Sequence, residues 1–371
     1  MLINFVSIGA GGNTTCGVSV TGTAYCWGRN DTGQLGDGTI TNRSLPTKIA
    51  APSGVQFVAV AQNGRDASAC VVNCARTTTG AIYCWGAGAA GNIGDGVLGD
   101  HLTPTLAAAP GGVTFTSVTA GGVHTFGATA AGVAYCWGNG VRGALGDGTG
   151  TNRPLPTLVV PPGGVSFATI AAGSATTCGT TFAGAAYCWG AGTFSQIGDG
   201  GAAVDRFSPT LVAAPGGVTF AAAQAGGPVS CGLAFGGVVY CWGFGATNQI
   251  GDGTTTTRLT PVPVAAPGGV TFTRLAMSTS HACALTTTGA VFCWGDNGSG
   301  QIGDGTQTDR NVPTAVSMPA GVTFTAISTG PGHACGLTAQ GAVYCWGGNT
   351  SGQIGDGTAT GARLTPVRVA R

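Results

Sequence analysis

The sequence predicts an all-β protein, a seven-bladed β-propeller with four short strands in each blade. Three observations lead to this fold class. One unit of about fifty residues recurs seven times, each copy holds four segments of β type, and no stretch has helical periodicity. Because the core of a repeat array is shared between neighbouring units, we expect a single domain.

The recurring unit is clearest in residues 290–305, which read AVFCWGDNGSGQIGDG. Every copy has a Trp-Gly pair and, ten residues after the Trp, the Asp of a Gly-Asp-Gly turn. Successive Trp lie 58, 52, 52, 53, 52 and 52 residues apart. The pairs are Trp27/Asp37, Trp85/Asp95, Trp137/Asp147, Trp189/Asp199, Trp242/Asp252, Trp294/Asp304 and Trp346/Asp356. The domain over 1–371 divides into repeats at about 3–54, 55–112, 113–164, 165–217, 218–269, 270–321 and 322–371.

Each unit contains the four predicted strands in a fixed order. It opens on an alternating Val-x-Phe segment, such as Val270 to Phe272, which is typical of a half-buried strand. Residues 281–286 and 290–294 form a hairpin around Thr287-Thr288-Gly289, where Gly allows a positive φ. A Pro-containing segment such as 259–264 closes the unit, and its Pro favours an outer strand.

The composition excludes several classes of partner. Charged residues make up 7% of the 371 residues, all the acids are Asp, one base is Lys, and the net charge is +1. Without a basic face, the chain has no electrostatic footprint for nucleic acid or for anionic membranes. No apolar run approaches 18 residues, so we expect no membrane insertion. The first residues lack the features of a secretory signal, so an exported form would have lost its signal from this numbering.

Six repeats carry a Cys ten residues before a second Cys that directly precedes the Trp. The hairpin register places Cys283 opposite Cys293 on neighbouring strands, within the reach of a disulfide. Buried free thiols are the alternative, and zinc is a weaker one because His124, His281 and His333 supply too few further ligands. Disulfides would indicate an extracellular, cell-surface or periplasmic location. The pairs are Cys16/Cys26, Cys74/Cys84, Cys178/Cys188, Cys231/Cys241, Cys283/Cys293 and Cys335/Cys345.

The second repeat is the irregular one. It has about six extra residues between Phe57 and Cys74, including a surplus Cys70, while Cys136 of the third repeat lacks its partner. Whether these two cysteines pair cannot be derived from the sequence. Insertions in repeat arrays lie in loops, often on the binding face. We therefore expect a binding loop here, with Gln62, Asn63, Arg65 and Asp66 as its contact residues.

The repeated Trp and Asp are expected to be structural. A large aromatic at one place in every unit is typical of a core between blades rather than of ligand stacking. A lone Asp among glycines does not supply the oxygens of a calcium site, whereas an Arg or His six or seven residues later suggests an ion pair. These bases are Arg43, His101, Arg153, Arg206, Arg258, Arg310 and Arg363.

No catalytic set stands out, so we expect no enzyme, no cofactor and no metal. There is no Glu, and no Ser-His-Asp or Cys-His combination is singled out. Glycosylation is possible in a suitable host, since five sequons are present, although in Thr-rich turns they equally arise by chance. The sequons begin at Asn13, Asn30, Asn42, Asn297 and Asn349.

The unit resembles the repeat of the regulator of chromosome condensation family. The resemblance runs through all seven units and is most specific where a Trp-Gly pair is followed by Gly-Gln-Leu-Gly at 33–36 or Gly-Gln-Ile-Gly at 300–303. It implies a seven-bladed propeller, in agreement with the count of units. The Cys-paired, Gly-Asp-Gly-Thr form is similar to the secreted bacterial branch of that family, and no residue-level site carries over.

Two functional hypotheses follow. The first is a non-enzymatic extracellular binding scaffold that presents propeller loops to a protein or glycan partner. The second is a structural subunit that self-assembles into an extracellular filament or surface layer, because so few charges keep copies apart.

Overall fold

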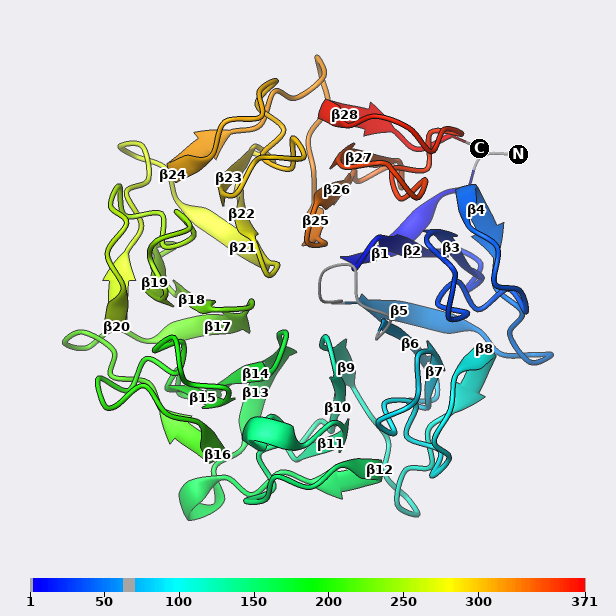
Figure 1. Cartoon of the computed structure of the whole chain (residues 1–371), viewed down its shortest axis with the longest axis horizontal. Coiled ribbons are helices and arrows are strands. Elements are labelled where there is room, and N and C mark those ends of the chain that lie inside the picture. Colours follow the sequence, from blue (N-terminus) through cyan, green and yellow to red (C-terminus); the bar gives the residue numbers. More distant parts are fainter. Residues whose placement is uncertain (1–2, 63–70, 371) are drawn as a thin grey trace.

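The computed structural model, which describes residues 3–62 and 71–370, is a closed ring of seven four-stranded antiparallel sheets (Figure 1). We number the blades 1 to 7 along the chain. Each blade is built from four consecutive strands, and the blade order around the ring is the sequence order. The fold class predicted from the repeats is thereby confirmed.

The strands occupy equivalent places in every blade. The innermost strands, which surround the axis, are β1 (Phe5–Gly11), β5 (Phe57–Gln62), β9 (Ser117–Ala120), β13 (Phe167–Ala172), β17 (Phe220–Ala225), β21 (Phe272–Met277) and β25 (Ala326–Thr329). The second strands are β2 (Thr14–Ser19), β6 (Val72–Thr77), β10 (His124–Ala128), β14 (Thr176–Thr181), β18 (Val229–Ala234), β22 (His281–Thr286) and β26 (His333–Leu337). The third strands are β3 (Ala24–Gly28), β7 (Ile82–Gly86), β11 (Ala134–Gly138), β15 (Ala186–Gly190), β19 (Val239–Gly243), β23 (Val291–Gly295) and β27 (Val343–Gly347). The outermost strands are β4 (Arg43–Lys48), β8 (His101–Leu106), β12 (Arg153–Leu158), β16 (Arg206–Leu211), β20 (Arg258–Pro263), β24 (Arg310–Ala315) and β28 (Arg363–Arg368).

The described part of the chain contains only two short 3-10 segments, η1 (Val141–Gly143) and η2 (Pro162–Gly164). None of its helices has the length and apolar character needed to cross a bilayer. One sequence expectation needs correction, because the Val-x-Phe segments are not themselves strands. Val270 precedes β21 and Phe272 begins it, since the strand needs the Phe as its anchor in the core while the preceding Pro-Gly-Gly segment forms a turn.

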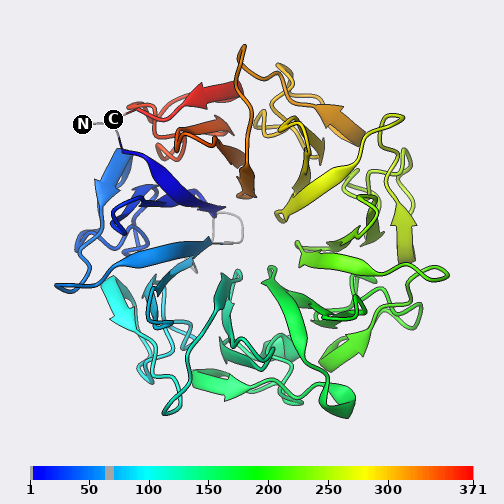
Figure 2. The same ribbon diagram turned by 180° about the vertical axis from the view of Figure 1, so that it is seen from behind.

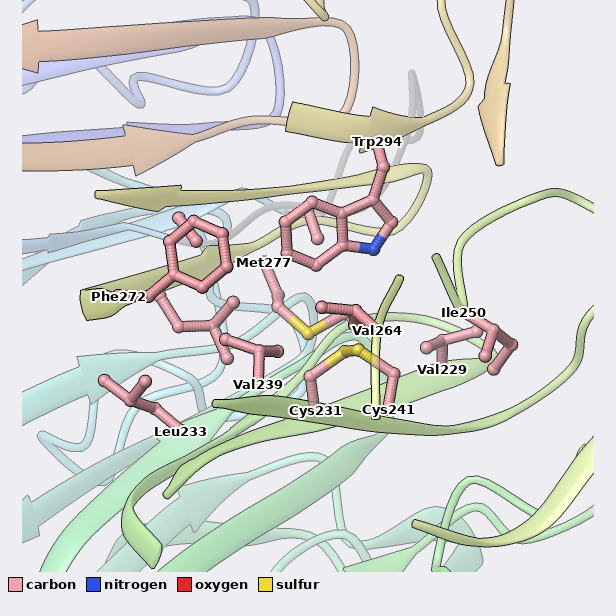
Figure 3. Close-up of a cluster of buried hydrophobic side chains, with 13 residues drawn as sticks. Val229, Cys231, Leu233, Val239, Cys241, Ile250, Val264, Phe272, Met277 and Trp294 are labelled. Atoms are coloured by element: carbon pink, nitrogen blue, oxygen red, sulfur yellow. A yellow bond between two sulfur atoms is a disulfide. The ribbon is translucent and has the colours of Figure 1, made fainter. Parts of the chain in front are cut away.

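Among the described residues, the hydrophobic core consists of seven clusters, each shared by two neighbouring blades. In Figure 3, Trp294 and Phe272 of blade 6 lie over the Cys231–Cys241 disulfide and Val239 of blade 5. Burying one large apolar side chain contributes about 1.5–3 kcal/mol. Because these clusters lie between sheets and not within them, a blade cannot bury its apolar side chains without its neighbours.

The ring closes by packing, without a strand exchanged between the ends. The cluster that joins the last blade to the first contains Phe5 and Trp27 together with Leu337 and Ile354. A backbone hydrogen bond from the N–H of Phe5 to the carbonyl of Gly341 (2.9 Å) supports this contact. Figures 1 and 2 show the first and last blades side by side.

The first Gly of each Gly-Asp-Gly turn packs on the Trp of the next blade. Gly198 has φ +76°, and a Cβ atom built on it lies 2.4 Å from Nε1 and 2.5 Å from Cδ1 of Trp242. We therefore expect Gly198→Ala to lower the free energy of unfolding by about 2–4 kcal/mol, from backbone strain plus overpacking. Urea unfolding measures this change.

Gly216→Ala is the matched control, because Gly216 lies outside the left-handed region and a Cβ built there meets nothing within 4 Å. Its expected change is below about 0.5 kcal/mol. Equal effects of the two substitutions would contradict the proposed contact with Trp242.

Candidate binding site

Six disulfides join the cysteines of the hairpins formed by the second and third strands. Cys283 faces Cys293 in the β22–β23 register, and their Cα atoms are 4.1 Å apart. The other five bridges are Cys16–Cys26, Cys74–Cys84, Cys178–Cys188, Cys231–Cys241 and Cys335–Cys345. The pairing therefore follows the register that the hairpin loop dictates.

Blade 3 carries a free thiol in place of a bridge. Cys136 faces Phe126, is fully buried, and donates its S–H to the carbonyl of Thr157 (3.3 Å). Burial raises the pKa of this thiol far above its ordinary value. Phe126 packs against Trp189 with ring centroids 6.0 Å apart, so apolar contact replaces the cross-link. Cys70 lies outside the described residues.

Each Trp connects its blade to the preceding one. All seven are fully buried, and Nε1 of Trp294 donates to the carbonyl of Gln249 at 3.0 Å. Trp27, Trp85, Trp137, Trp242 and Trp346 make the equivalent bond. In blade 4, Nε1 of Trp189 has no partner among the described residues. Because all seven Trp side chains are fully buried between blades, none of them is available to stack on a ligand.

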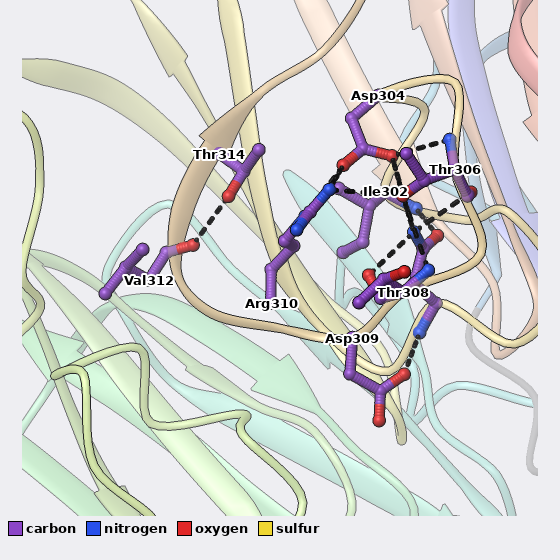
Figure 4. A network of polar contacts seen from close by, with 9 residues as sticks. Ile302, Asp304, Thr306, Thr308, Asp309, Arg310, Val312 and Thr314 are labelled. Carbon is purple, nitrogen blue, oxygen red and sulfur yellow. Dashed lines mark hydrogen bonds and ion pairs between the residues drawn. The ribbon is translucent and has the colours of Figure 1, made fainter.

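The Asp of each Gly-Asp-Gly turn organises its own loop (Figure 4). Asp304 accepts from the backbone N–H (2.9 Å) and the hydroxyl (2.7 Å) of Thr306 and pairs with Arg310, whose Nε is 2.7 Å away. Burial opposes ionisation of Asp304, but these hydrogen bonds outweigh it and hold its pKa below the ordinary value. The other ion pairs are Asp37–Arg43, Asp147–Arg153, Asp199–Arg206, Asp252–Arg258 and Asp356–Arg363. In blade 2 the ring nitrogen Nε2 of His101 lies 3.4 Å from Asp95 at the equivalent place.

Three histidines lie inside blade contacts. The rings of His124, His281 and His333 are fully buried, and burial lowers the pKa of each to about 3. Each uses a ring nitrogen in a hydrogen bond to a neighbouring hydroxyl, at 2.7, 2.9 and 2.9 Å respectively. Within residues 3–62 and 71–370 there is no group of three or more potential metal ligands.

Three of the five sequons are closed to modification in the folded protein. Asn30, Asn297 and Asn349 are fully buried, and their carboxamides hold the loop after the Trp-Gly pair. Asn297, for example, accepts from the N–H of Ile302 (2.9 Å) and donates to the carbonyl of Thr306 (3.1 Å). A glycan at these three positions is not compatible with the folded loop, because the amide nitrogen that would carry it is buried and hydrogen-bonded there.

The expected binding loop of the second repeat is described only at its first residue. Gln62 ends β5 and bonds blade 1, accepting from the N–H of Cys16 at 3.1 Å. Asn63, Arg65 and Asp66 lie outside the described residues, so their role in binding stays a prediction.

A cavity of about 640 Å³ lies elsewhere in the described part of the chain. Its lining comes from two kinds of connection, those between first and second strands and those that follow the Trp-Gly pairs. Consecutive strands are antiparallel, so both kinds emerge on one face, which we call the Trp-Gly face. The lining residues belong to blades 3 to 6: Arg142, Ser174, Ala175, Thr176, Ala191, Phe194, Gln196, Gly227, Pro228, Phe244, Thr247, Gln249 and Thr279.

Two aromatic rings form a wall of this cavity. Phe194 of blade 4 and Phe244 of blade 5 have ring centroids 5.4 Å apart at an interplanar angle of 57°. Phe194 remains 46% exposed, which is unusual for so large an apolar side chain. Exposed aromatic surface beside a hollow is typical of a recognition site.

The one ionisable lining side chain is neutralised within the protein. Arg142 of blade 3 makes two parallel hydrogen bonds to Asp205 of blade 4, at 2.9 and 2.8 Å, and a third to the hydroxyl of Thr193 at 2.9 Å. The hydrogen bonds to Asp205 raise the pKa of the guanidinium. The cavity therefore presents no uncompensated charge.

The loops around the cavity break a backbone rule that other blades obey. At the loop position six residues after the Trp, five blades have a Gly with positive φ. Blades 4 and 5 have Ser195 (φ 62°) and Asn248 (φ 63°) there instead. Non-Gly residues in this region carry strain and concentrate at functional sites.

The recurring residues of the repeat do not indicate this site, but the differences between repeats do. Phe194 and Phe244 stand at loop positions where other units have small or polar residues, such as Ser299 and Ala87. Comparing the units for what differs between them, instead of for what recurs, identifies both rings.

These features define a disulfide-linked propeller with an uncharged, partly aromatic cavity on one face. The regulator of chromosome condensation (RCC1) repeat matches residues 21–71, 79–128, 131–179, 183–233, 236–285 and 288–337. A second description of the repeat matches 5–34, 272–301 and 324–353. The chain belongs to the RCC1-repeat family, as its loop motifs suggest.

Relatives in this family have diverse names. The chain is 30% identical over 340 residues to the ultraviolet-B receptor UVR8 of Arabidopsis thaliana, which covers 91% of this chain and 76% of the receptor. It is 31% identical over 354 residues to the E3 ubiquitin-protein ligase HERC2 of Homo sapiens, covering 94% of this chain but 7% of the ligase.

Solved structures share the fold. Human WBSCR16 superposes with a TM-score of 0.82 at 22% identity, over 91% of this chain and 88% of that one. Yeast RCC1 (Prp20), solved with Kap60 bound, gives 0.81 at 18% identity over 95% and 85%. At these identities the likeness concerns the fold alone.

Proposed function

We propose that this protein is a non-enzymatic binding scaffold that works outside the cytosol and takes a protein or glycan partner on its Trp-Gly face. One observation carries the proposal. The Trp, Cys and Asp side chains that recur in most or all blades are engaged inside the ring, whereas Phe194 and Phe244, which are peculiar to blades 4 and 5, line the cavity of about 640 Å³. Recognition by residues that differ between units is how a repeat array makes one place on its ring unlike the others.

The chemistry of the cavity supports binding over catalysis. Its lining has no Asp, His or Cys, and the charge of Arg142 is compensated by Asp205. General acid–base or nucleophilic catalysis needs a titratable or activated group facing the substrate. A family member of known structure, yeast RCC1, was solved with a protein bound to it, which agrees with a binding role.

Six buried disulfides support the location outside the cytosol. Such bridges persist where the surroundings are oxidising and are rare where thiols are kept reduced.

The outer strands argue for a scaffold over a self-assembling subunit. Every outermost strand has a Pro at the same place, which removes an N–H and disfavours pairing of exposed sheet edges between copies. These residues are Pro46, Pro104, Pro156, Pro209, Pro261, Pro313 and Pro366.

A double variant tests the proposal. Phe194→Ser with Phe244→Ala introduces residues that other units carry at these places, and so should leave the ring intact. Chemical cross-linking in material from the native source should capture a partner with the wild-type protein and not with the variant. Phe182→Ala, on the opposite face of blade 4 and 66% exposed in the wild type, is the control and should keep the partner. Identical capture by all three proteins would refute the assignment of the site.

A further inference from the structure

A glutamine recurs in the loops of the Trp-Gly face and has a defined structural task in two of them. In blade 1, Oε1 of Gln34 accepts from the N–H of Thr32 (2.8 Å), while its Nε2 donates to Asp31 (2.9 Å). In blade 6, Gln301 repeats this arrangement with Ser299 and Asp296, at 2.8 and 2.9 Å. An acidic residue of the same loop thus occupies the amide hydrogens.

Blades 4, 5 and 7 keep the glutamine but lack the acid. In blade 7, Nε2 of Gln353 has another acceptor, Oδ1 of Asn13 at 3.5 Å. At the two loop positions that hold Asp31 and Asp296, blade 4 has Thr193 and Ala191, and blade 5 has Ala246 and Phe244. The glutamines of these two blades, Gln196 and Gln249, are therefore left without that partner.

Gln196 keeps the hydrogen bond that its Oε1 accepts but lacks the one that its Nε2 would donate. Its Oε1 accepts from the N–H of Phe194 (2.8 Å), but its Nε2 has no acceptor among the described residues. The residue is only 2% exposed and lines the cavity. The Nε2 atom itself is not fully buried, because it reaches the cavity, and it is therefore free to bond a ligand there.

Gln249 supplies the complementary group. It is 4% exposed, and its Nε2 turns to the carbonyl of Thr279 in blade 6 (3.0 Å). Its Oε1 then has no donor among the described residues. Two neighbouring blades thus bring one unused donor and one unused acceptor to the same cavity, beside the Phe194–Phe244 wall.

We propose that this cavity binds a neutral oligosaccharide of two or three sugar rings. The inference rests on the proposed function and names its ligand. Sugar hydroxyls both donate and accept, so they match Gln196 Nε2 and Gln249 Oε1, and the apolar face of a pyranose ring covers the exposed ring of Phe194. A volume of about 640 Å³ lies in the range that encloses small ligands. A purely apolar ligand would leave Gln196 Nε2 and Gln249 Oε1 without hydrogen-bond partners.

Isothermal titration calorimetry with cellotriose, maltotriose and chitotriose, each to about 10 mM, tests the proposal. We expect saturable binding of at least one of them and no binding of the anionic trigalacturonate. Gln196→Glu keeps the acceptor for Phe194 and removes the donor, and should weaken binding at least about tenfold. Phe194→Ala should weaken it about tenfold through lost aromatic contact. Phe182→Ala is the matched control and should bind as the wild type does.

The outcomes separate this inference from the proposed function. If no neutral trisaccharide binds, or if Gln196→Glu and Phe194→Ala bind as tightly as the wild type, the saccharide is wrong. Capture of a protein partner that depends on Phe194 and Phe244 would then leave the scaffold standing with a peptide in the cavity. If the protein binds no neutral trisaccharide and captures no partner through Phe194 and Phe244, the proposed function is refuted as well.

Discussion

Refolding this protein without its disulfides is expected to lower the melting temperature by roughly 20 °C. Each bridge joins cysteines ten residues apart, and in the chain-entropy model such a link contributes about 2–3 kcal/mol. Six of them amount to roughly 15 kcal/mol, which is comparable with the whole stability of many domains. Thermal unfolding followed by circular dichroism, after refolding from guanidinium with or without a reductant, measures the difference.

The reductant must be present during refolding, because all twelve bridged cysteines are fully buried in the folded ring. Cys136→Ala, refolded under oxidising conditions, controls for the chemistry of the free thiol and should stay within a few degrees of the wild type. Hydrogen exchange adds a second readout. Blade 3 has no bridge, so its own hairpin should lose the least protection. A shift below about 5 °C would mean that packing between blades, and not cross-linking, holds the ring.

Acid is expected to destabilise the protein well before its aspartates titrate. His124, His281 and His333 have folded-state pKa values of about 3, below the ordinary 6.5 of an unfolded histidine. The unfolded chain therefore binds more protons as the pH falls, and stability is lost from about pH 6.5 down to about pH 3. Each histidine contributes about 1.4 kcal/mol per pH unit, or roughly 8 kcal/mol for three between pH 6.5 and 4.5. Urea unfolding at pH 7 and 4.5 measures the loss.

Two other blades provide the control substitution. Val72 and Val229 occupy the place of these histidines in blades 2 and 5. The triple variant His124→Val, His281→Val and His333→Val should therefore fold and lose the pH dependence in this window. The remaining loss of stability should appear below about pH 4, where protonation of the aspartates breaks their ion pairs. The aspartates with lowered pKa values in these pairs are Asp37, Asp147, Asp252, Asp304 and Asp356. An unchanged slope in the triple variant would assign the acid sensitivity to other groups.

The success of sequence reasoning here follows from the repeat. A three-residue loop at 287–289 places Cys283 opposite Cys293, and the observed register has them paired. The same reasoning misplaced the opening strand, which begins at Phe272 and not at Val270. Local alternation of apolar residues does not say where backbone pairing starts, because that depends on the neighbouring strand.

The candidate site could not be predicted from the repeat pattern, because its residues come together only in the folded ring. Phe194 and Phe244 are fifty residues apart and carry no motif. Gln196 has a counterpart in blades 1, 5, 6 and 7, and the sequence pattern alone does not show that its Nε2 lacks an acceptor.

The sequence by itself determined the number of blades, the strand order and the disulfide pairing, because these depend on short-range spacing copied from unit to unit. The tertiary structure alone decided which residues meet between blades. Closing the ring brings the loops of blades 3 to 6 to one face around a cavity. The residues of their own loops leave amide groups of Gln196 and Gln249 unpaired, but only the packing of neighbouring blades brings these two groups to one cavity.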